Sequence, residues 1–142
     1  MLCLQVQAKH LHNEKYYQNI WCSEHNGNME VKLVDKTRID CLTKDHAIEF
    51  DFANKWAEAI GQSLHYSYLT GRKAGIVLII EKEEDYKHLN KIKPLCEKLD
   101  ITLWEMRPPK KEVHTTKLYN FEEIIELLLN VIKELLKLFT NF

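Results

Sequence analysis

The sequence lacks a large net charge of either sign, because 20 Lys and Arg residues against 21 Asp and Glu give only −1 at pH 7. A near-neutral chain has no global basic field for wrapping nucleic acid or binding anionic lipid, although a local patch can still contact phosphate. The sequence also lacks any apolar run near the roughly 18 residues that a transmembrane helix needs. Its 142 residues leave no room for two ordinary globular domains.

Two common zinc signatures are also missing. No cysteines have the Cys-x-x-Cys spacing of a zinc ribbon, and no His-Glu-x-x-His motif is present. The cysteines are spread along the chain, at Cys3, Cys22, Cys41 and Cys96. Their even number permits disulfides, and Cys22 and Cys41 would meet if the first helix packed beside the first hairpin. We favour the alternative, in which the thiols are free and buried in a reducing cytoplasm.

The N-terminal stretch, residues 1–8, lacks both the basic start and the full apolar core of a signal peptide. We therefore expect a cytoplasmic protein. The stretch is also compatible with the remainder of a trimmed leader, so export stays open.

The first part of the chain predicts one helix followed by a hairpin. Residues 13–24 place apolar side chains at helical spacing, and Asn26-Gly27 is a suitable helix end. Residues 29–34 and 37–43 alternate between apolar and polar side chains, with Asp35-Lys36 between them as a tight-turn candidate. This pattern indicates two antiparallel strands.

Acidic residues interrupt the apolar pattern of residues 37–43 and of the next predicted strand, residues 46–52. Asp40 lies in the first of these, and Glu49 and Asp51 lie in the second, opposite its aromatic face. Glu49 and Asp51 are about 7 Å apart along a strand, so their charges repel unless a cation lies between them. Hard carboxylate oxygens suit Mg²⁺ or Mn²⁺, and we therefore expect a metal-ion site here.

A helix is predicted from Asn54, a candidate N-cap, to a C-terminal stop at Gly71. Lys55, Gln62 and Tyr66 recur along one side of this helix, separate from its apolar side. The helix follows directly after the strand that carries two of the carboxylates, so we expect this side to contribute to the same site.

The remaining elements complete a sheet with helices. Residues 74–81 form a near-continuous β-branched run, which predicts a buried central strand parallel to a neighbour. Residues 83–100 predict a helix that is interrupted or ended near Pro94, and residues 101–106 predict a last short strand. The predicted class is α/β or α+β, a mixed sheet flanked by helices.

A proline- and lysine-rich stretch, residues 108–111, separates this domain from a strongly amphipathic helix over residues 121–139. We therefore divide the chain into a domain over residues 9–107 and a linker with a C-terminal helix over residues 108–142. The apolar face of that helix has three candidate partners, which are the domain itself, a second copy in a homodimer, and a membrane surface.

The acidic and helical motifs together resemble the PD-(D/E)xK nuclease superfamily, and most closely its RecB-like branch with a Gln-x-x-x-Tyr motif. Glu14 matches the acidic residue of the first helix, Asp40 the aspartate of the second strand and Glu49 the glutamate of the third. Gln62 and Tyr66 match the Gln-x-x-x-Tyr pair. The resemblance implies a restriction-endonuclease-like αβββαβ core, Mg²⁺ or Mn²⁺ as cofactor, and DNA as substrate. Two stretches, WCSEHNG and DFANKWAEAIGQ, also resemble bacterial proteins.

One position departs from the family pattern. The lysine expected two residues after Glu49 is replaced by Asp51, and Lys55 is placed to supply it from the following helix. The family then implies metal binding by Asp40, Glu49, Asp51 and Glu14, a catalytic role for Lys55 with Asp40 and Glu49, and substrate positioning by Gln62 and Tyr66. We expect a metal-dependent deoxyribonuclease. The alternatives are an inactive nucleic-acid-binding or interaction module of this fold, and an unrelated α/β interaction protein.

Overall fold

The computed structural model describes residues 10–109 and 121–140, with side chains up to residue 137. The N-terminal stretch with Cys3 and most of the predicted linker lie outside these ranges. The chain divides into two units, Met1–Pro109 and Lys110–Phe142. Within the described ranges, no helix is both long and apolar enough to cross a membrane.

The first unit is built on a mixed five-stranded sheet with strand order β1-β2-β3-β4-β5. β1, β2 and β3 pair antiparallel, whereas β3, β4 and β5 pair parallel. Parallel neighbours need a crossover connection, and a helix supplies each one. The strands are β1 (Asn28–Lys32), β2 (Arg38–Leu42), β3 (His46–Phe52), β4 (Lys73–Ile79) and β5 (Thr102–Met106).

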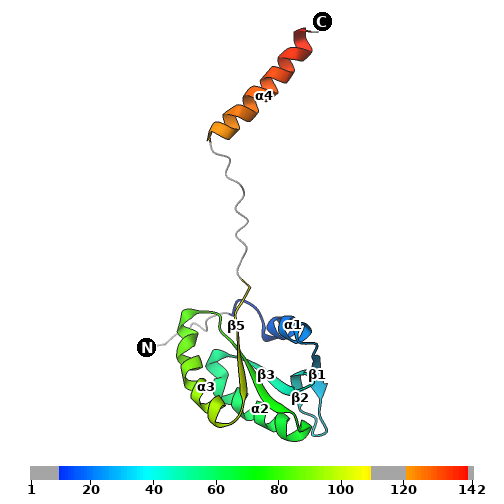
Figure 1. Ribbon diagram of the computed structural model, residues 1–142, viewed down its shortest axis with the longest axis vertical. Coiled ribbons are helices and arrows are strands. Elements are labelled where there is room, and N and C mark those ends of the chain that lie inside the picture. Colours follow the sequence, from blue (N-terminus) through cyan, green and yellow to red (C-terminus); the bar gives the residue numbers. More distant parts are fainter. Residues whose placement is uncertain (1–9, 110–120, 141–142) are drawn as a thin grey trace, which may run out of the picture. The chain divides into compact units, whose positions relative to one another are not determined.

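Helices cover both faces of this sheet, with α1 (Glu14–Glu24) on one face and α2 (Trp56–Thr70) and α3 (Tyr86–Lys98) on the other (Figure 1). β4 has buried side chains on both faces, as the near-continuous apolar run predicted. Val77 packs with residues of α1, whereas Ile76 packs with residues of α2 and α3. The predicted class, a mixed sheet between helices, is confirmed.

The β1–β2 hairpin has a three-residue loop, not the predicted two-residue turn. The amide of Leu33 donates to the carbonyl of Thr37 at 2.8 Å, and Lys36 adopts the left-handed conformation with φ of 72°. A three-residue loop that ends in a left-handed residue is a common hairpin connection. The pairing that results sets Glu30 beside Asp40, between two paired positions of the ladder.

The two helices that follow β3 and β4 differ from the prediction in detail. A 3₁₀ turn (Ala53–Lys55) precedes α2, so Asn54 is not the N-cap and Lys55 lies just before the helix. Gly71 does end α2, with φ of 67°. α3 follows a second 3₁₀ turn (Glu83–Asp85) and continues through Pro94, because its buried face on either side of the proline is packed against the sheet.

Cys22 and Cys41 form a disulfide, so the expectation of free thiols is wrong for this pair. α1 lies against β2, which brings the two Cα atoms to 5.9 Å, inside the range that a disulfide spans. Cys96, on the buried face of α3, is free, as expected.

Gly27 lies directly beside the disulfide. A Cβ atom at this position would be 2.3 Å from Sγ of Cys41 and 2.6 Å from Sγ of Cys22. The two sulfur atoms are bonded to each other and cannot easily move apart to relieve this clash. Gly27→Ala is therefore expected to lower the free energy of unfolding by about 1–3 kcal/mol, measured by denaturant titration. The control is Gly61→Ala, where a Cβ would meet nothing within 4 Å on helix α2. That substitution is expected to add roughly 0.5–1 kcal/mol, and equal effects at the two glycines would contradict the prediction.

Candidate metal-binding and catalytic site

The candidate site lies where β2 and β3 separate. These strands pair only through Cys41 with Ile48 and Leu42 with Ala47. Beyond this point, Oδ2 of Asp40 accepts a hydrogen bond from the backbone amide of Phe50 at 2.8 Å. The Asp40 side chain thus takes the place of the β2 carbonyl that would otherwise accept from the Phe50 amide, and its carboxyl group is held against β3.

Glu49 is buried on β3, with 5% of its surface exposed. Its carboxyl group donates a hydrogen bond to Asp40, and its second oxygen, Oε2, is buried without a hydrogen-bond partner. Burial, followed by the charge of Asp40, raises the pKa of Glu49. Burial likewise raises the pKa of Asp40, and the Phe50 amide offsets only part of this effect. Two carboxyl groups in contact share one proton, because both cannot ionise at low cost.

Asp51 is the third buried carboxyl group, two residues further along β3 and 3% exposed. Burial raises its pKa to about 7, although Lys55 acts in the opposite direction. Nζ of Lys55 is 3.6 Å from Oδ1 of Asp51, and the amide of Phe52 donates to the same oxygen at 3.0 Å. The carboxylate of Asp51 in turn raises the pKa of Lys55, which stays charged.

Glu14 approaches this group from the first turn of α1. Nε2 of the buried Gln18 donates to Oε1 of Glu14 at 3.1 Å, and this bond holds the carboxyl group in place. Burial raises the pKa of Glu14, and Lys55 lowers it in part. The charge of Glu14 raises the pKa values of Asp40 and Asp51 in turn. The four carboxyl groups therefore form one electrostatic cluster.

Tyr66 closes the cluster from α2. It is 4% exposed and packs with Ile39 and Ala47 on the face of β3 that carries the carboxyl groups. Burial, together with the charge of Glu49, raises the pKa of its hydroxyl group. Gln62, one turn earlier on α2, is exposed and hydrogen-bonds to Tyr66.

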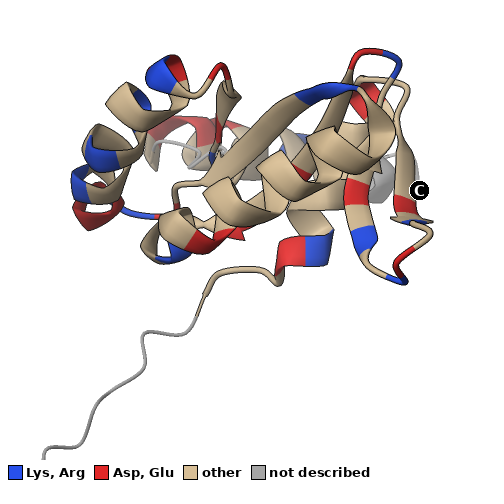
Figure 2. Cartoon of the chain, turned by 90° about the horizontal axis from the view of Figure 1, so that it is seen from below, with Lys and Arg blue, Asp and Glu red and all other residues tan. Residues whose placement is uncertain are grey.

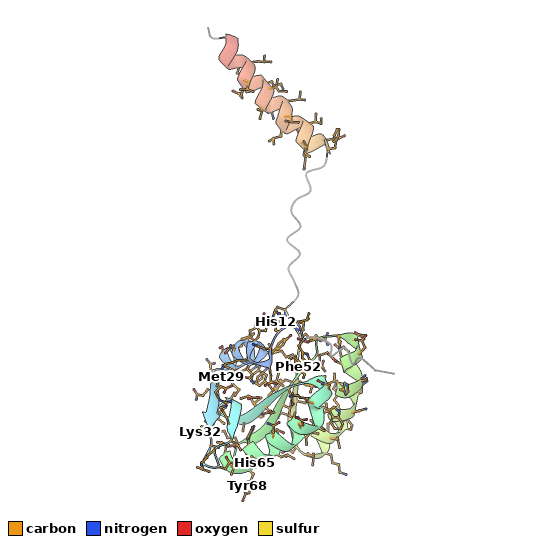
Figure 3. The ribbon with its side chains drawn as sticks, turned by 180° about the vertical axis from the view of Figure 1, so that it is seen from behind. His12, Met29, Lys32, Phe52, His65 and Tyr68 are labelled. Atoms are coloured by element: carbon orange, nitrogen blue, oxygen red, sulfur yellow. A yellow bond between two sulfur atoms is a disulfide. The ribbon has the colours of Figure 1, made fainter. Side chains whose placement is uncertain are left out.

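A second connection between α2 and the hairpin is made by His65, the residue next to Tyr66 on α2. Nε2 of His65 is 2.7 Å from Oδ2 of Asp35 in the β1–β2 loop. In Figure 3, His65 and Tyr68 lie together at one end of the domain, whereas His12 and Phe52 lie toward the opposite end. This contact fixes the hairpin that carries Asp40 against the helix that carries Tyr66.

The structure thus brings all the predicted site residues into one region, joined by hydrogen bonds, an ion pair and mutual charge effects. Sequence reasoning missed Glu30, whose charge raises the pKa values of Glu14 and Asp40 and which pairs with Arg38 at 2.8 Å. The correct loop length would have revealed it, since that loop sets Glu30 beside Asp40. Gln18 was visible one helical turn after Glu14, but its burial and its hydrogen bond were not.

The donor set fits a hard divalent cation. Within residues 10–109 and 121–140, no group of three His, Cys, Asp or Glu residues is arranged to hold a metal ion with the side chains as they stand. The carboxyl group of Glu49 is nevertheless hydrogen-bonded to that of Asp40, and its buried Oε2 has no hydrogen-bond partner. A cation would offset both the burial and the mutual repulsion that raise the pKa values of Asp40, Glu49 and Asp51.

Charge outside the cluster is mixed. Figure 2 shows acidic and basic positions distributed over several elements, with no single basic stripe in this view. The most basic element is α3, which exposes Lys87, Lys91, Lys93 and Lys98. Any contact with a polyanion would therefore be local, as the near-zero net charge indicated.

Comparisons with known protein families, curated proteins and solved structures gave no match.

Proposed function

We propose that the protein is a metal-dependent nuclease that hydrolyses phosphodiester bonds of DNA. The observation that carries the proposal is the buried carboxyl cluster of Asp40, Glu49 and Asp51, with one unpartnered oxygen on Glu49. A sequence selected for stability alone would not bury three carboxyl groups whose charges repel. Perturbed pKa values of this kind are concentrated at functional sites.

The element order supports the proposal. The first six helices and strands run α1, β1, β2, β3, α2, β4, apart from the short 3₁₀ turn before α2. This is the αβββαβ order that the resemblance to the PD-(D/E)xK superfamily implies. The acidic residues also lie on the elements that the resemblance assigns to them, with Glu14 on α1, Asp40 on β2 and Glu49 on β3.

Each side chain has a role that its position supports. Asp40 and Glu49 would hold the Mg²⁺ or Mn²⁺ ion, with Asp51 and Glu14 as further ligands or as residues that orient them. Such an ion would supply a bound water of lowered pKa and polarisation of the phosphate. Lys55 is half-exposed beside the buried carboxyl group of Asp51, which leaves its ammonium group available to the scissile phosphate.

Gln62 and Tyr66 complete the site from α2. The buried Tyr66 hydroxyl lies within the electrostatic influence of Glu49, where it can orient a ligand of the ion. The exposed Gln62 amide, hydrogen-bonded to Tyr66, is placed to contact the nucleic-acid backbone. The residues next to the cluster thus supply polar contacts to DNA without a large basic surface.

A second candidate function is a non-catalytic module of the same fold that binds nucleic acid or protein. Two observations favour it, which are the acidic residue Asp51 at the position of the family lysine and the pairing of Lys55 with that same carboxyl group. Metal binding without cleavage of any nucleic acid would select this function over the first.

The cellular location of the protein is a separate question from its activity. The expectation of a cytoplasmic protein remains a prediction, and the Cys22–Cys41 disulfide weighs against it, because disulfides persist mainly in oxidising compartments.

The nuclease proposal is tested by incubating labelled single- and double-stranded DNA with the protein and Mg²⁺, Mn²⁺ or EDTA. We expect cleavage with a divalent ion and none with EDTA. Asp40→Asn keeps an oxygen that can accept from the Phe50 amide but removes the charge, so cleavage is expected to fall at least about 100-fold. The control is Asp100→Asn, an exposed position with φ of 55° that Asn tolerates. Unchanged cleavage in Asp40→Asn would remove this residue from the site.

A further inference from the structure

A pocket on the α1 side of the sheet is lined mainly by aromatic rings. Trp21 and His25 lie at the end of α1, His46 begins β3, and Trp104 lies on β5. All of these residues belong to the first unit, whereas the second unit is described only by the helix α4 (Phe121–Thr140). Such a group of rings around an open pocket is suited to a flat aromatic ligand.

The pocket lies on the other face of the sheet from the carboxyl cluster. Ile48 lines the pocket and packs with residues of α1, and side chains alternate along a strand, so Glu49 points to the opposite face. His46 and Asp51 lie at opposite ends of β3, about 17 Å apart along the strand. A ligand in this pocket therefore does not occupy the candidate metal site.

The rings are held in place by contacts within the first unit. The exposed His25 ring stacks on Trp21 with centroids 3.6 Å apart, and its Nδ1 donates to the carbonyl of Trp21 at 2.7 Å. The Trp104 indole lies directly against β4, where a Cβ on Gly75 would be 2.8 Å from it. The centroids of Trp21 and His46 are each 5.1 Å from that of Trp104. Rings fixed in this way bind a flat ligand at a low entropic cost.

The rim of the pocket is basic. The exposed Lys44 lines it from the turn between β2 and β3, and Nη1 of Arg72 donates to a backbone carbonyl of the same turn. Burial, followed by the charge of Lys73, lowers the pKa of His46, so this ring is neutral at pH 7 and Lys73 lies near it. Lys44, Arg72 and Lys73 outnumber the acidic Asp45, which also lines the pocket. The local excess of positive charge favours an anionic ligand.

We propose that this pocket binds an unpaired nucleobase together with its phosphate, with the base against the aromatic rings and the phosphate beside Lys44, Arg72 and Lys73. Aromatic side chains stack on the flat face of any base, and basic side chains attract the phosphate backbone. A base within a duplex must first be unstacked and unpaired, which costs free energy. The ligand is therefore single-stranded nucleic acid or a free nucleotide, which present the same chemistry. Such binding does not depend on cleavage by the carboxyl cluster.

The test measures binding of a fluorescein-labelled oligothymidylate to the full-length chain by fluorescence anisotropy in EDTA. An oligonucleotide of about ten residues is within the usual site sizes of single-strand-binding proteins. We expect it to bind at least about 10-fold more tightly than its duplex with oligodeoxyadenylate. His25→Ala removes an exposed ring from the pocket and is expected to weaken binding about 10-fold. The control is Tyr68→Ala on α2, where the lost ring is 84% exposed on the other side of the sheet.

The phosphate contact is tested with Lys44→Gln. This variant is expected to bind the single strand more weakly and to reduce the slope of log affinity against log salt concentration by about 0.7. Lys87→Gln on α3 removes an exposed charge from the opposite side of the sheet and is expected to change neither quantity. Thermal unfolding checks that all four variants stay folded.

Competition with thymidine monophosphate distinguishes the two sources of the base. Displacement of the labelled strand would assign the pocket to free nucleotides as well, whereas failure to compete would assign it to strands alone. No binding to the wild type, equal affinity for duplex and single strand, or full affinity in both His25→Ala and Lys44→Gln would overturn the nucleobase pocket. Binding through the pocket without cleavage in Mg²⁺ or Mn²⁺ would contradict the nuclease proposal alone.

Discussion

Glu49→Gln is expected to abolish metal-dependent DNA cleavage while it stabilises the metal-free protein. Glutamine keeps the size of the buried side chain, and its amide can still donate to Asp40, but the charge that would bind the ion is lost. We expect cleavage to fall at least about 100-fold. At about pH 8 without metal, the melting temperature is expected to rise by several degrees, because the buried Glu49 must take up a proton on folding at this pH and glutamine needs none.

The matched control is Glu105→Gln on β5, where the carboxylate is exposed and pairs with Lys93 and Arg107. Cleavage is expected to be unchanged in this variant, and the stability change should stay within about 1 kcal/mol, as for exposed ion pairs. If Glu49→Gln cut DNA at the wild-type rate, Glu49 would not be a ligand. If it lowered the melting temperature, the carboxyl group would have a structural role instead.

The metal-free protein is expected to lose stability as the pH rises from about 5 to about 8, and a divalent ion is expected to restore it. The pKa values of Asp40, Glu49 and Asp51 are raised on folding, so the folded state binds protons more tightly than the unfolded state. The stability that these groups contribute is complete below their unfolded pKa values, near 4, and is lost as the pH rises through the folded values. For Asp51 the folded pKa is about 7.

The expected size follows from about 1.4 kcal/mol for each unit of pKa difference. A loss of about 2 kcal/mol lowers the melting temperature by roughly 10 °C in a domain of this size. Mg²⁺ or Mn²⁺ binds the ionised carboxylates only in the folded state, so at about pH 8 each ion should raise the melting temperature, and at about pH 5 the effect should be smaller.

The measurement is a series of thermal melts in EDTA, Mg²⁺ and Mn²⁺ across this range. Asp51→Asn, which removes one of the titrating groups, should flatten the dependence on pH. The range excludes values below about pH 4, where Glu81, whose pKa is lowered by its hydrogen bonds to Tyr17 and His10, acts in the opposite direction. Melting temperatures independent of both pH and metal would contradict the cluster as a cation site.

Much of the sheet and its acidic residues could be predicted from local pattern. Residues 46–52 alternate so clearly that both ends of β3 were correct, and the same alternation placed Glu49 and Asp51 on one face. β4 was predicted from its β-branched run, and the end of α2 from Gly71, because each depends on the chemistry of a few neighbouring residues.

The features that failed depend on the fold around them. Asp35-Lys36 contains no glycine to mark the left-handed residue, so the sequence did not reveal the three-residue loop or the position of Glu30 that follows from it. The sequence also did not reveal that the carboxyl groups of Glu49 and Asp51 are buried. The acidic face of β3 looked open in the sequence, whereas α2 covers it in the structure and brings Tyr66 against it.

The Cys22–Cys41 disulfide has a consequence for the dynamics of the site. It joins α1, which carries Glu14, to β2, which carries Asp40, and the two cysteines are 19 residues apart. β1 and β2 form the outer strands at one side of the sheet, where local opening costs least. When these strands open locally, the disulfide keeps α1 and β2 close together. The effective concentration of Glu14 near Asp40 therefore stays high, and the cluster re-forms quickly.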